Sequence, residues 1–191
     1  YRQTDPQKEV ITQIHFLKRG DISVKKMNDH LKEYTLQLQK GDIQKAYKGI
    51  MVFMSGLKKY MESRHPGYKT SAVYPGYMDM TYFAFTPFEL RGKNLKIAVV
   101  YLHEQNRFEV WLGGVNRSIQ KQYIEIFKDK NIGEAKLSKA ASGVDSILEL
   151  ELIGKPDFDH PDETMMLIEK MTMDFLKDIL SSFNMQEDIP K

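Results

Sequence analysis

The middle third of the sequence contains the acidic and basic side chains best suited to chemistry. Asp79 lies inside YMDMTYFAF, where aromatic neighbours make an unpaired charge costly. If Asp79 and Glu109 point to the same side of a sheet, their carboxyl groups share a polar pocket. Tyr77, His103 or Arg107 would then lie nearby, and general acid-base catalysis is conceivable there. The alternative is that Asp79 pairs with a lysine or arginine, or lies at an exposed strand end.

The stretch RFEVWLGGVNRSI combines the single tryptophan of the chain, Trp111, with two glycines and a helix start. We expect Gly113 and Gly114 to let the chain leave a strand at backbone angles closed to other residues, and Asn116 to cap the next helix. Backbone N–H groups at this turn, the helix N-terminus and Arg117 would form an anion-binding concavity beside Trp111. Many corners of this kind bind nothing, so a purely structural role is the alternative interpretation.

Familiar catalytic motifs do not match. A nuclease of the PD-(D/E)xK type needs an acidic residue on its second strand and Glu-x-Lys on its third, whereas the third strand here reads EVW and the second has no acid. The zinc-protease motif HExxH fails at His103, because residue 107 is arginine. FDHPDE at 158–163 could ligate a metal, but carboxylates in a first helical turn more commonly complement the helix dipole. We therefore assign no catalytic residue, cofactor or metal.

Composition limits the class of protein. The 191 residues include no cysteine, which excludes disulfides and thiolate metal sites and favours a reducing compartment. The apolar runs fall far short of the ~20 residues that span a bilayer, so we expect a soluble, cytoplasmic protein without a membrane partner. Of the 28 basic and 26 acidic residues, 4 basic and 12 acidic ones follow from Asp145 onward, which leaves residues 1–144 at +10. This basic body either presents a solvated face or touches phosphate.

Hydrophobic periodicity predicts the elements that position these residues. Helices are expected at 5–19, 23–40, 42–64, 116–131 and from 161 onward. Strands are expected at 78–85, 95–103, 107–112 and 146–153, the first three in an antiparallel meander. The predicted fold class is α+β, with a mixed four-stranded sheet packed by amphipathic helices in the order α-α-α-β-β-β-α-β-α. We expect a helical appendage at 1–21, a single domain at 22–185 and a tail at 186–191.

Two features indicate surfaces that meet something else. The predicted helix at 42–64 carries Gly49 and Gly56, which cost ~1 kcal/mol each relative to alanine, so a sheet or a second subunit is expected to approach that face closely. Aromatic residues crowd the predicted meander. If helices cover one face of the sheet, an aromatic-rich second face is typical of a ligand cleft or a dimer interface.

Four stretches of the chain carry a family resemblance: LQKGDIQKAYKGIM, YPGYMDMTYFAFTP, LKIAVVYLHEQNRFEVWLGG and GVDSI. They are similar to an uncharacterised microbial family, a domain of unknown function found as a single-domain protein. The resemblance covers roughly residues 30–183 and leaves the first expected helix outside. It implies no particular activity, cofactor or catalytic residue.

The leading interpretation is non-catalytic binding, either of a small ligand on the aromatic sheet or of a second copy of the chain. The candidate ligand-binding residues are Tyr77, Asp79, His103, Glu109, Trp111 and Arg117. The alternative is a degenerate nuclease-like domain that associates with nucleic acid through the basic body. A third hypothesis is an enzyme that works through Asp79, His103 and Glu109. The expected partners are thus a small anionic ligand or a homodimer partner, with nucleic acid ranked below both.

Overall fold

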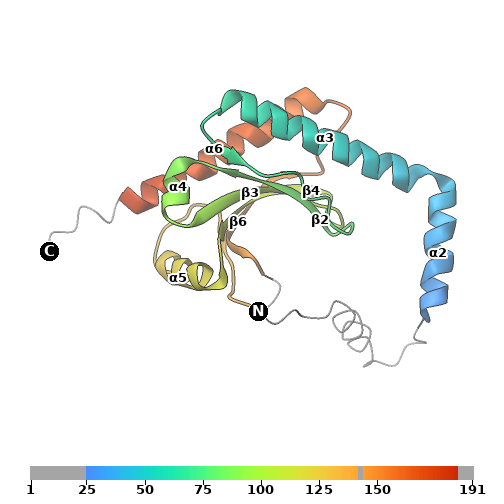
Figure 1. Cartoon of the computed structure of the whole chain (residues 1–191), viewed down its shortest axis with the longest axis horizontal. Helices are drawn as coiled ribbons and strands as arrows, with labels where there is room; N and C mark the ends of the chain where they lie inside the picture. The colour runs from blue at the N-terminus through green and yellow to red at the C-terminus, as the bar shows by residue number, and fades with distance from the viewer. Residues whose placement is uncertain (1–24, 142–143, 185–191) are drawn as a thin grey trace. The chain divides into compact units, whose positions relative to one another are not determined.

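The computed structural model describes residues 25–141 and 144–184 (Figure 1), and the chain divides into two units between Ala46 and Tyr47. The first unit contains helix α2 (Met27–Lys40), which ends at Gly41 in the left-handed conformation with a φ of 81°. Helix α3 (Asp42–Arg64) begins there and continues into the second unit. The helix expected at 5–19 lies outside the described residues.

The second unit is built on one antiparallel sheet. Its described strands are β1 (Lys69–Thr70), β2 (Met80–Thr86), β3 (Leu95–Leu102), β4 (Arg107–Gly114), β5 (Lys136–Leu137) and β6 (Ser146–Gly154), in the order β1-β2-β3-β4-β6-β5. Helix α4 (Phe88–Gly92) joins β2 to β3, α5 (Arg117–Phe127) follows β4, and α6 (Pro161–Asn184) follows β6. The predicted α+β class and antiparallel meander are therefore confirmed.

The prediction of a mixed, four-stranded sheet is wrong in two respects. The sheet has six described strands, and every strand pairing is antiparallel. The two added strands, β1 and β5, contain two residues each, too few to show an alternating pattern. The five residues of α4 are likewise too few for helical periodicity, so the predicted element order was also wrong.

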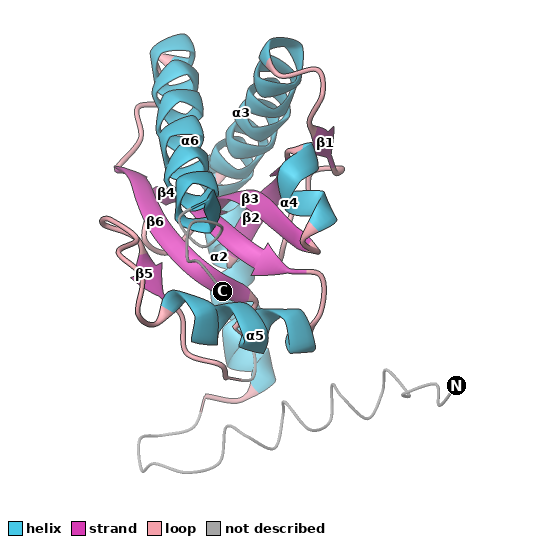
Figure 2. Cartoon of the chain, turned by 90° about the vertical axis from the view of Figure 1, so that its left-hand side faces the viewer, coloured by secondary structure: helices cyan, strands magenta, loops and turns pink. Residues whose placement is uncertain are grey.

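The two faces of the sheet differ. Phe108, Val110 and Leu112 of β4 are buried in the core, and the ring of Phe108 lies 5.5 Å from that of Phe53 in α3. Helices α3 and α6 cover this face (Figures 1 and 2). Because side chains alternate along a strand, Glu109 and Trp111 point to the opposite face. In the second unit, α5 lies on that side of the sheet (Figure 1).

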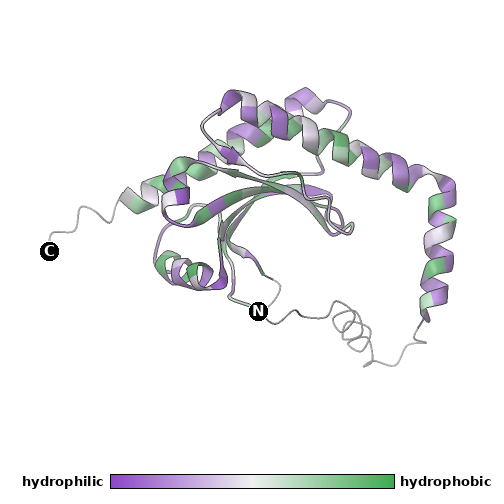
Figure 3. Cartoon of the chain, in the orientation of Figure 1, coloured by the Kyte–Doolittle hydropathy of each residue, from purple (hydrophilic) through white to green (hydrophobic). Residues whose placement is uncertain are grey.

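Helices α3, α5 and α6 each bury one side. Figure 3 shows hydrophobic and hydrophilic residues alternating along α3 and α6, as expected of helices that lie on a sheet. Helix α5 buries Ile124 and Phe127, and the ring of Phe127 lies 5.7 Å from that of Phe183 near the end of α6. Within the described chain, no helix combines the length and apolar character needed to cross a membrane.

Candidate functional site

The face of the sheet opposite α3 and α6 contains a hollow of about 310 Å³. Strands β2, β3 and β4 supply most of its wall and floor, with contributions from the segments before β2 and before β6. The lining residues are Tyr74, Met80, Tyr82, Ala84, Lys96, Ala98, Val100, Trp111, Gly113 and Asp145. This volume lies at the lower end of the range, roughly 300 to 1,000 Å³, in which proteins bind small molecules.

Small side chains in the middle of the strands create the hollow. Ala84 pairs with Ala98 across β2 and β3, and Ala98 pairs in turn with Trp111 of β4. Sheet interiors favour β-branched and aromatic residues, so two paired alanines leave space that such residues would fill. The large ring of Trp111 borders this space on one side.

Two tyrosine rings also line the hollow. Tyr82, which pairs with Val100, faces the hollow from β2, and Tyr74 reaches β2 through an isolated backbone bridge to Tyr82. The two phenol rings lie 5.1 Å apart, centroid to centroid, at an angle of 40°. Burial is the main cause that raises the pKa of Tyr82, with Tyr74 and Asp145 adding to it, so the hydroxyl stays protonated at neutral pH.

A buried carboxylate holds the tryptophan in place. Glu109 is only 4% exposed, and its Oε2 accepts a hydrogen bond of 2.6 Å from the indole Nε1–H of Trp111. Its Oε1 lies 2.6 Å from Nη2 of Arg107, and Nη1 of the same guanidinium lies 3.2 Å from Oε2 of Glu151. Residues 107, 109 and 111 share one face of β4, so each side chain can reach the next. The carboxylate is thereby satisfied, and the indole has a set orientation.

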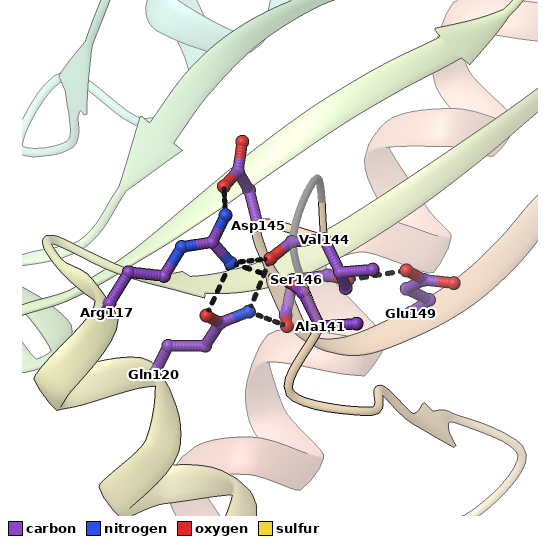
Figure 4. Close-up of polar contacts among 7 residues, drawn as sticks. All are labelled: Arg117, Gln120, Ala141, Val144, Asp145, Ser146 and Glu149. Carbon is purple, nitrogen blue, oxygen red and sulfur yellow. Dashed lines mark hydrogen bonds and ion pairs between the residues drawn. The ribbon is translucent and has the colours of Figure 1, made fainter. Parts of the chain in front are cut away.

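The side chain of Arg117 holds the segment that leads into β6 (Figure 4). Its guanidinium donates to the carbonyl oxygens of Ala141 and Val144 and lies 3.3 Å from the carboxylate of Asp145. The amide of Gln120 adds 2.8 Å bonds to the carbonyl oxygens of Val144 and Ser146. Arg117 therefore acts on the hollow indirectly, by positioning Asp145 at its rim.

The corner between β4 and α5 contains glycines because a side chain at Gly114 would collide with the backbone of the following helix. Neither Gly113 nor Gly114 is among the described residues with a positive φ, so the expectation about their backbone angles is wrong. A Cβ on Gly114 would lie 2.8 Å from the backbone nitrogen of Gln120 and 3.1 Å from the carbonyl oxygen of Asn116. The predicted cap is confirmed, since the side chain of Asn116 accepts from the backbone N–H of Ile119 at 3.0 Å.

Asp79 and His103 lie together, but away from Glu109. The backbone N–H of His103 donates to the carbonyl oxygen of Asp79 at 3.0 Å, and its ring packs edge-on against Tyr101. Tyr101 pairs with Phe108 and faces α3, on the side of the sheet opposite Glu109. The single polar pocket considered from the sequence is therefore not formed by these three residues.

Asp79 itself belongs to a turn. Its Oδ1 accepts from the backbone N–H of Tyr77 at 2.9 Å, and this hydrogen bond is the main cause that lowers the pKa of the carboxyl group. The side chain is exposed, as the exposed strand-end alternative anticipated, and Tyr77 is 89% exposed beside it.

The acidic segment before α6 is also local in its contacts. His160 Nδ1 lies 2.7 Å from Asp157 Oδ2, and this contact raises the pKa of His160 and lowers that of Asp157. Asp162 and Glu163 occupy the first turn of α6, where they complement the helix dipole. Within residues 25–141 and 144–184, no group of three or more His, Asp or Glu side chains is arranged to hold a metal ion.

Of the candidate ligand-binding residues, Trp111 lines the hollow. Tyr74 and Tyr82, which also line it, were expected only as members of the aromatic group around the meander, and Lys96 and Asp145 were not expected there. A usable signal was present in FAF and KIAVV, where an alanine interrupts each bulky strand. That signal identifies a gap only when the register places Ala84 beside Ala98, which depends on strand pairing.

Comparison with known proteins identifies a family for the chain but no activity. A family model described as a domain of unknown function (DUF7000) matches residues 27–183. No curated protein and no solved structure matches the chain.

Proposed function

We propose that this chain, a member of the DUF7000 family of domains of unknown function, binds a small planar molecule in the hollow of its sheet. The observation that carries the proposal is the pairing of Ala84 with Ala98 in a hollow that Tyr82 and Trp111 also line. A flat apolar body would fill the space above the alanines and contact the rings at its edges.

The size of the hollow restricts the ligand. A volume of about 310 Å³ suits a molecule of one or two fused rings, and larger cofactors would extend beyond it. Trp111 is well placed to report binding. It is the single tryptophan of the chain, so an isotope-labelled sample gives one indole N–H resonance in proton-nitrogen NMR.

The proposal is tested by filling the hollow. We expect 2-naphthamide, a neutral two-ring probe, to shift the indole resonance of Trp111 saturably in the unaltered protein. Ala98→Phe should abolish this shift because the new ring occupies the floor. Leu102→Phe is the matched control, since Leu102 lies on the same strand and face but does not line the hollow. Absence of saturable binding, or equal binding by Ala98→Phe, would contradict the proposal.

Helix α2 supports a second candidate function, self-association. Its 14 residues include no buried side chain, although helices this short are marginally stable alone in water. Met27, Leu31, Tyr34 and Leu38 follow the alternating four- and three-residue spacing of a coiled-coil seam. The flanking positions are Asn28, His30, Thr35 and Gln37, so no pair of carboxylates or lysines would repel across two copies.

Light scattering after size-exclusion chromatography tests self-association. We expect a dimer for the unaltered chain and a monomer for Leu31→Glu, because the new charge lies in the seam. Leu36→Glu should remain dimeric, since Leu36 is also exposed but lies off the seam. If the unaltered chain is monomeric, or both variants dimerise, α2 has no such role.

The nuclease-like alternative is not favoured. The carboxylate of Glu109, which a metal-dependent nuclease would need as a ligand, is bonded to Arg107 and Trp111. The enzyme hypothesis has less support as well, because Asp79 and His103 lie on the other side of the sheet from Glu109.

A further inference from the structure

The hydrogen-bonding groups that line the hollow are unequally satisfied. Among the described residues, the hydroxyls of Tyr74 and Tyr82 and the ammonium of Lys96 have no hydrogen-bond or ion-pair partner, whereas the carboxylates of Glu109 and Asp145 do. The stem of Lys96 lies over Gly113, where a Cβ would meet its Cε at 3.4 Å. The amine is therefore carried at the edge of the hollow without a counter-charge of its own.

The carboxylates on this side of the sheet are already occupied. Asp145 lies 3.3 Å from Arg117. Glu109 is bonded to Arg107 and Trp111, and Glu149 accepts from the hydroxyls of Ser138 and Ser146. Among the residues that line the hollow, the amine of Lys96 has no described partner, whereas the one carboxylate, that of Asp145, is paired with Arg117. A ligand that complements this lining must bring acceptor atoms and a negative charge.

We propose that the ligand of this hollow is a planar aromatic carboxylate, with its rings between Trp111 and Tyr82 and its carboxylate at Lys96. This inference rests on the proposed function and adds the charge of the ligand to it. Lys96 then determines specificity for a charged ligand, whereas the alanines and aromatic rings determine the shape of the ligand.

The test compares two probes of the same shape, 2-naphthoate and 2-naphthamide, by the indole resonance of Trp111. The carboxylate should bind at least about tenfold more tightly than the amide, as expected for a hydrogen bond between charged groups. Lys96→Met keeps the stem and removes the charge, so it should reduce the affinity for naphthoate to that for naphthamide. The affinity for naphthamide should be unchanged in this variant.

Lys121→Met is the control for net charge, because Lys121 is exposed on α5 and does not line the hollow. It should keep the preference for naphthoate. Equal affinities for both probes, or a preference that survives Lys96→Met, would overturn the carboxylate inference while leaving small-molecule binding intact. If neither probe binds, or Ala98→Phe binds both unchanged, the proposed function fails together with the inference.

Discussion

At the residue scale, the link between Arg107, Glu109 and Trp111 is the feature that joins stability to the candidate site. Glu109 is buried and bridges a guanidinium and an indole, each at 2.6 Å. Hydrogen bonds to a charged, desolvated group are stronger than those between neutral groups. The same carboxylate thus keeps Arg107 compensated and sets the position of the ring that borders the hollow.

We expect Glu109→Ala to lower the free energy of unfolding by about 2–4 kcal/mol, because it leaves the Trp111 N–H and part of Arg107 without a partner in a buried setting. Urea denaturation followed by circular dichroism measures this change. Glu151→Ala removes the other acid bonded to Arg107. Because the side chain of Glu151 is 49% exposed, this substitution should cost less than about 1 kcal/mol. Equal costs for the two substitutions would show that burial of Glu109 has no special effect.

At the element scale, close approach between neighbouring elements decides where glycine is required. Gly114 lies where β4 turns into α5, and Gly56 of α3 has the Cε of Met165 in α6 at 3.0 Å from its Cβ position. Gly49, on the same helix, has no atom within 4 Å of that position. Within the chain, close approach along α3 therefore occurs at Gly56, where it comes from a methionine of α6 and not from the sheet; the approach of a second subunit at Gly49 stays a prediction.

Two glycine substitutions should change stability in opposite directions. Gly114→Ala places a Cβ against the backbone of α5 and should destabilise the fold by about 1–3 kcal/mol. Gly49→Ala adds helix propensity at an open position and should stabilise it by about 0.5–1 kcal/mol. Thermal unfolding monitored by circular dichroism distinguishes them. A tolerated Gly114→Ala would mean that the corner can relax.

A hydrogen-bonded chain also connects the elements on the helical side of the sheet. The hydroxyl of Thr81 donates to the carbonyl oxygen of Pro75 at 2.8 Å. Because the proton of this hydroxyl is used there, the contact of 2.8 Å with His103 Nε2 is a hydrogen bond in which the Nε2–H of His103 donates to the hydroxyl oxygen. The hydroxyl of Tyr47 in α3 donates to the same carbonyl oxygen at 3.2 Å. This chain ties β2 and β3 to α3.

Stability should depend on pH through His103. Burial, partly offset by Asp79, lowers the pKa of His103 below its ordinary value of 6.5, so the unfolded chain binds a proton more readily than the folded one. The stabilising contribution of neutral His103 is present above pH 6.5 and is lost as pH falls through the lower folded pKa. Between about pH 7 and about pH 5, the unaltered protein should lose more stability than His103→Gln.

Urea titrations at several pH values measure this difference. His160→Gln is the control, because His160 is exposed and its pKa is shifted in the opposite direction by Asp157. The His160→Gln variant should lose at least as much stability at low pH as the unaltered protein. If His103→Gln follows the same pH dependence as the unaltered protein, protonation of His103 does not contribute.

At the scale of the whole molecule, charge is distributed unevenly along the chain. The segment from Asp145 onward is acidic and the preceding residues are basic, yet part of the basic charge is locally paired. Lys58 lies 2.6 Å from Glu62, and Lys45 lies 4.0 Å from Asp42. Local pairing reduces the field that a polyanion would experience.

We therefore expect duplex DNA to bind weakly at low salt and not measurably at about 0.15 M salt. Fluorescence anisotropy of a labelled duplex, recorded over a salt series, measures this. Replacing Lys48 and Lys59 with glutamine should reduce the low-salt binding further. Tight binding that persists at physiological salt would instead support the nucleic-acid alternative.

The sequence by itself determined most of the elements. Periodicity predicted α3, the meander of β2, β3 and β4, the helix capped by Asn116, β6 and α6, because these depend on the order of apolar and polar residues along one segment. The tertiary structure alone decided that Asp79 and His103 lie on the other side of the sheet, that Arg117 holds the segment before β6, and that Ala84 meets Ala98. These facts depend on register, turns and pairing between residues far apart in the chain, which no local pattern specifies.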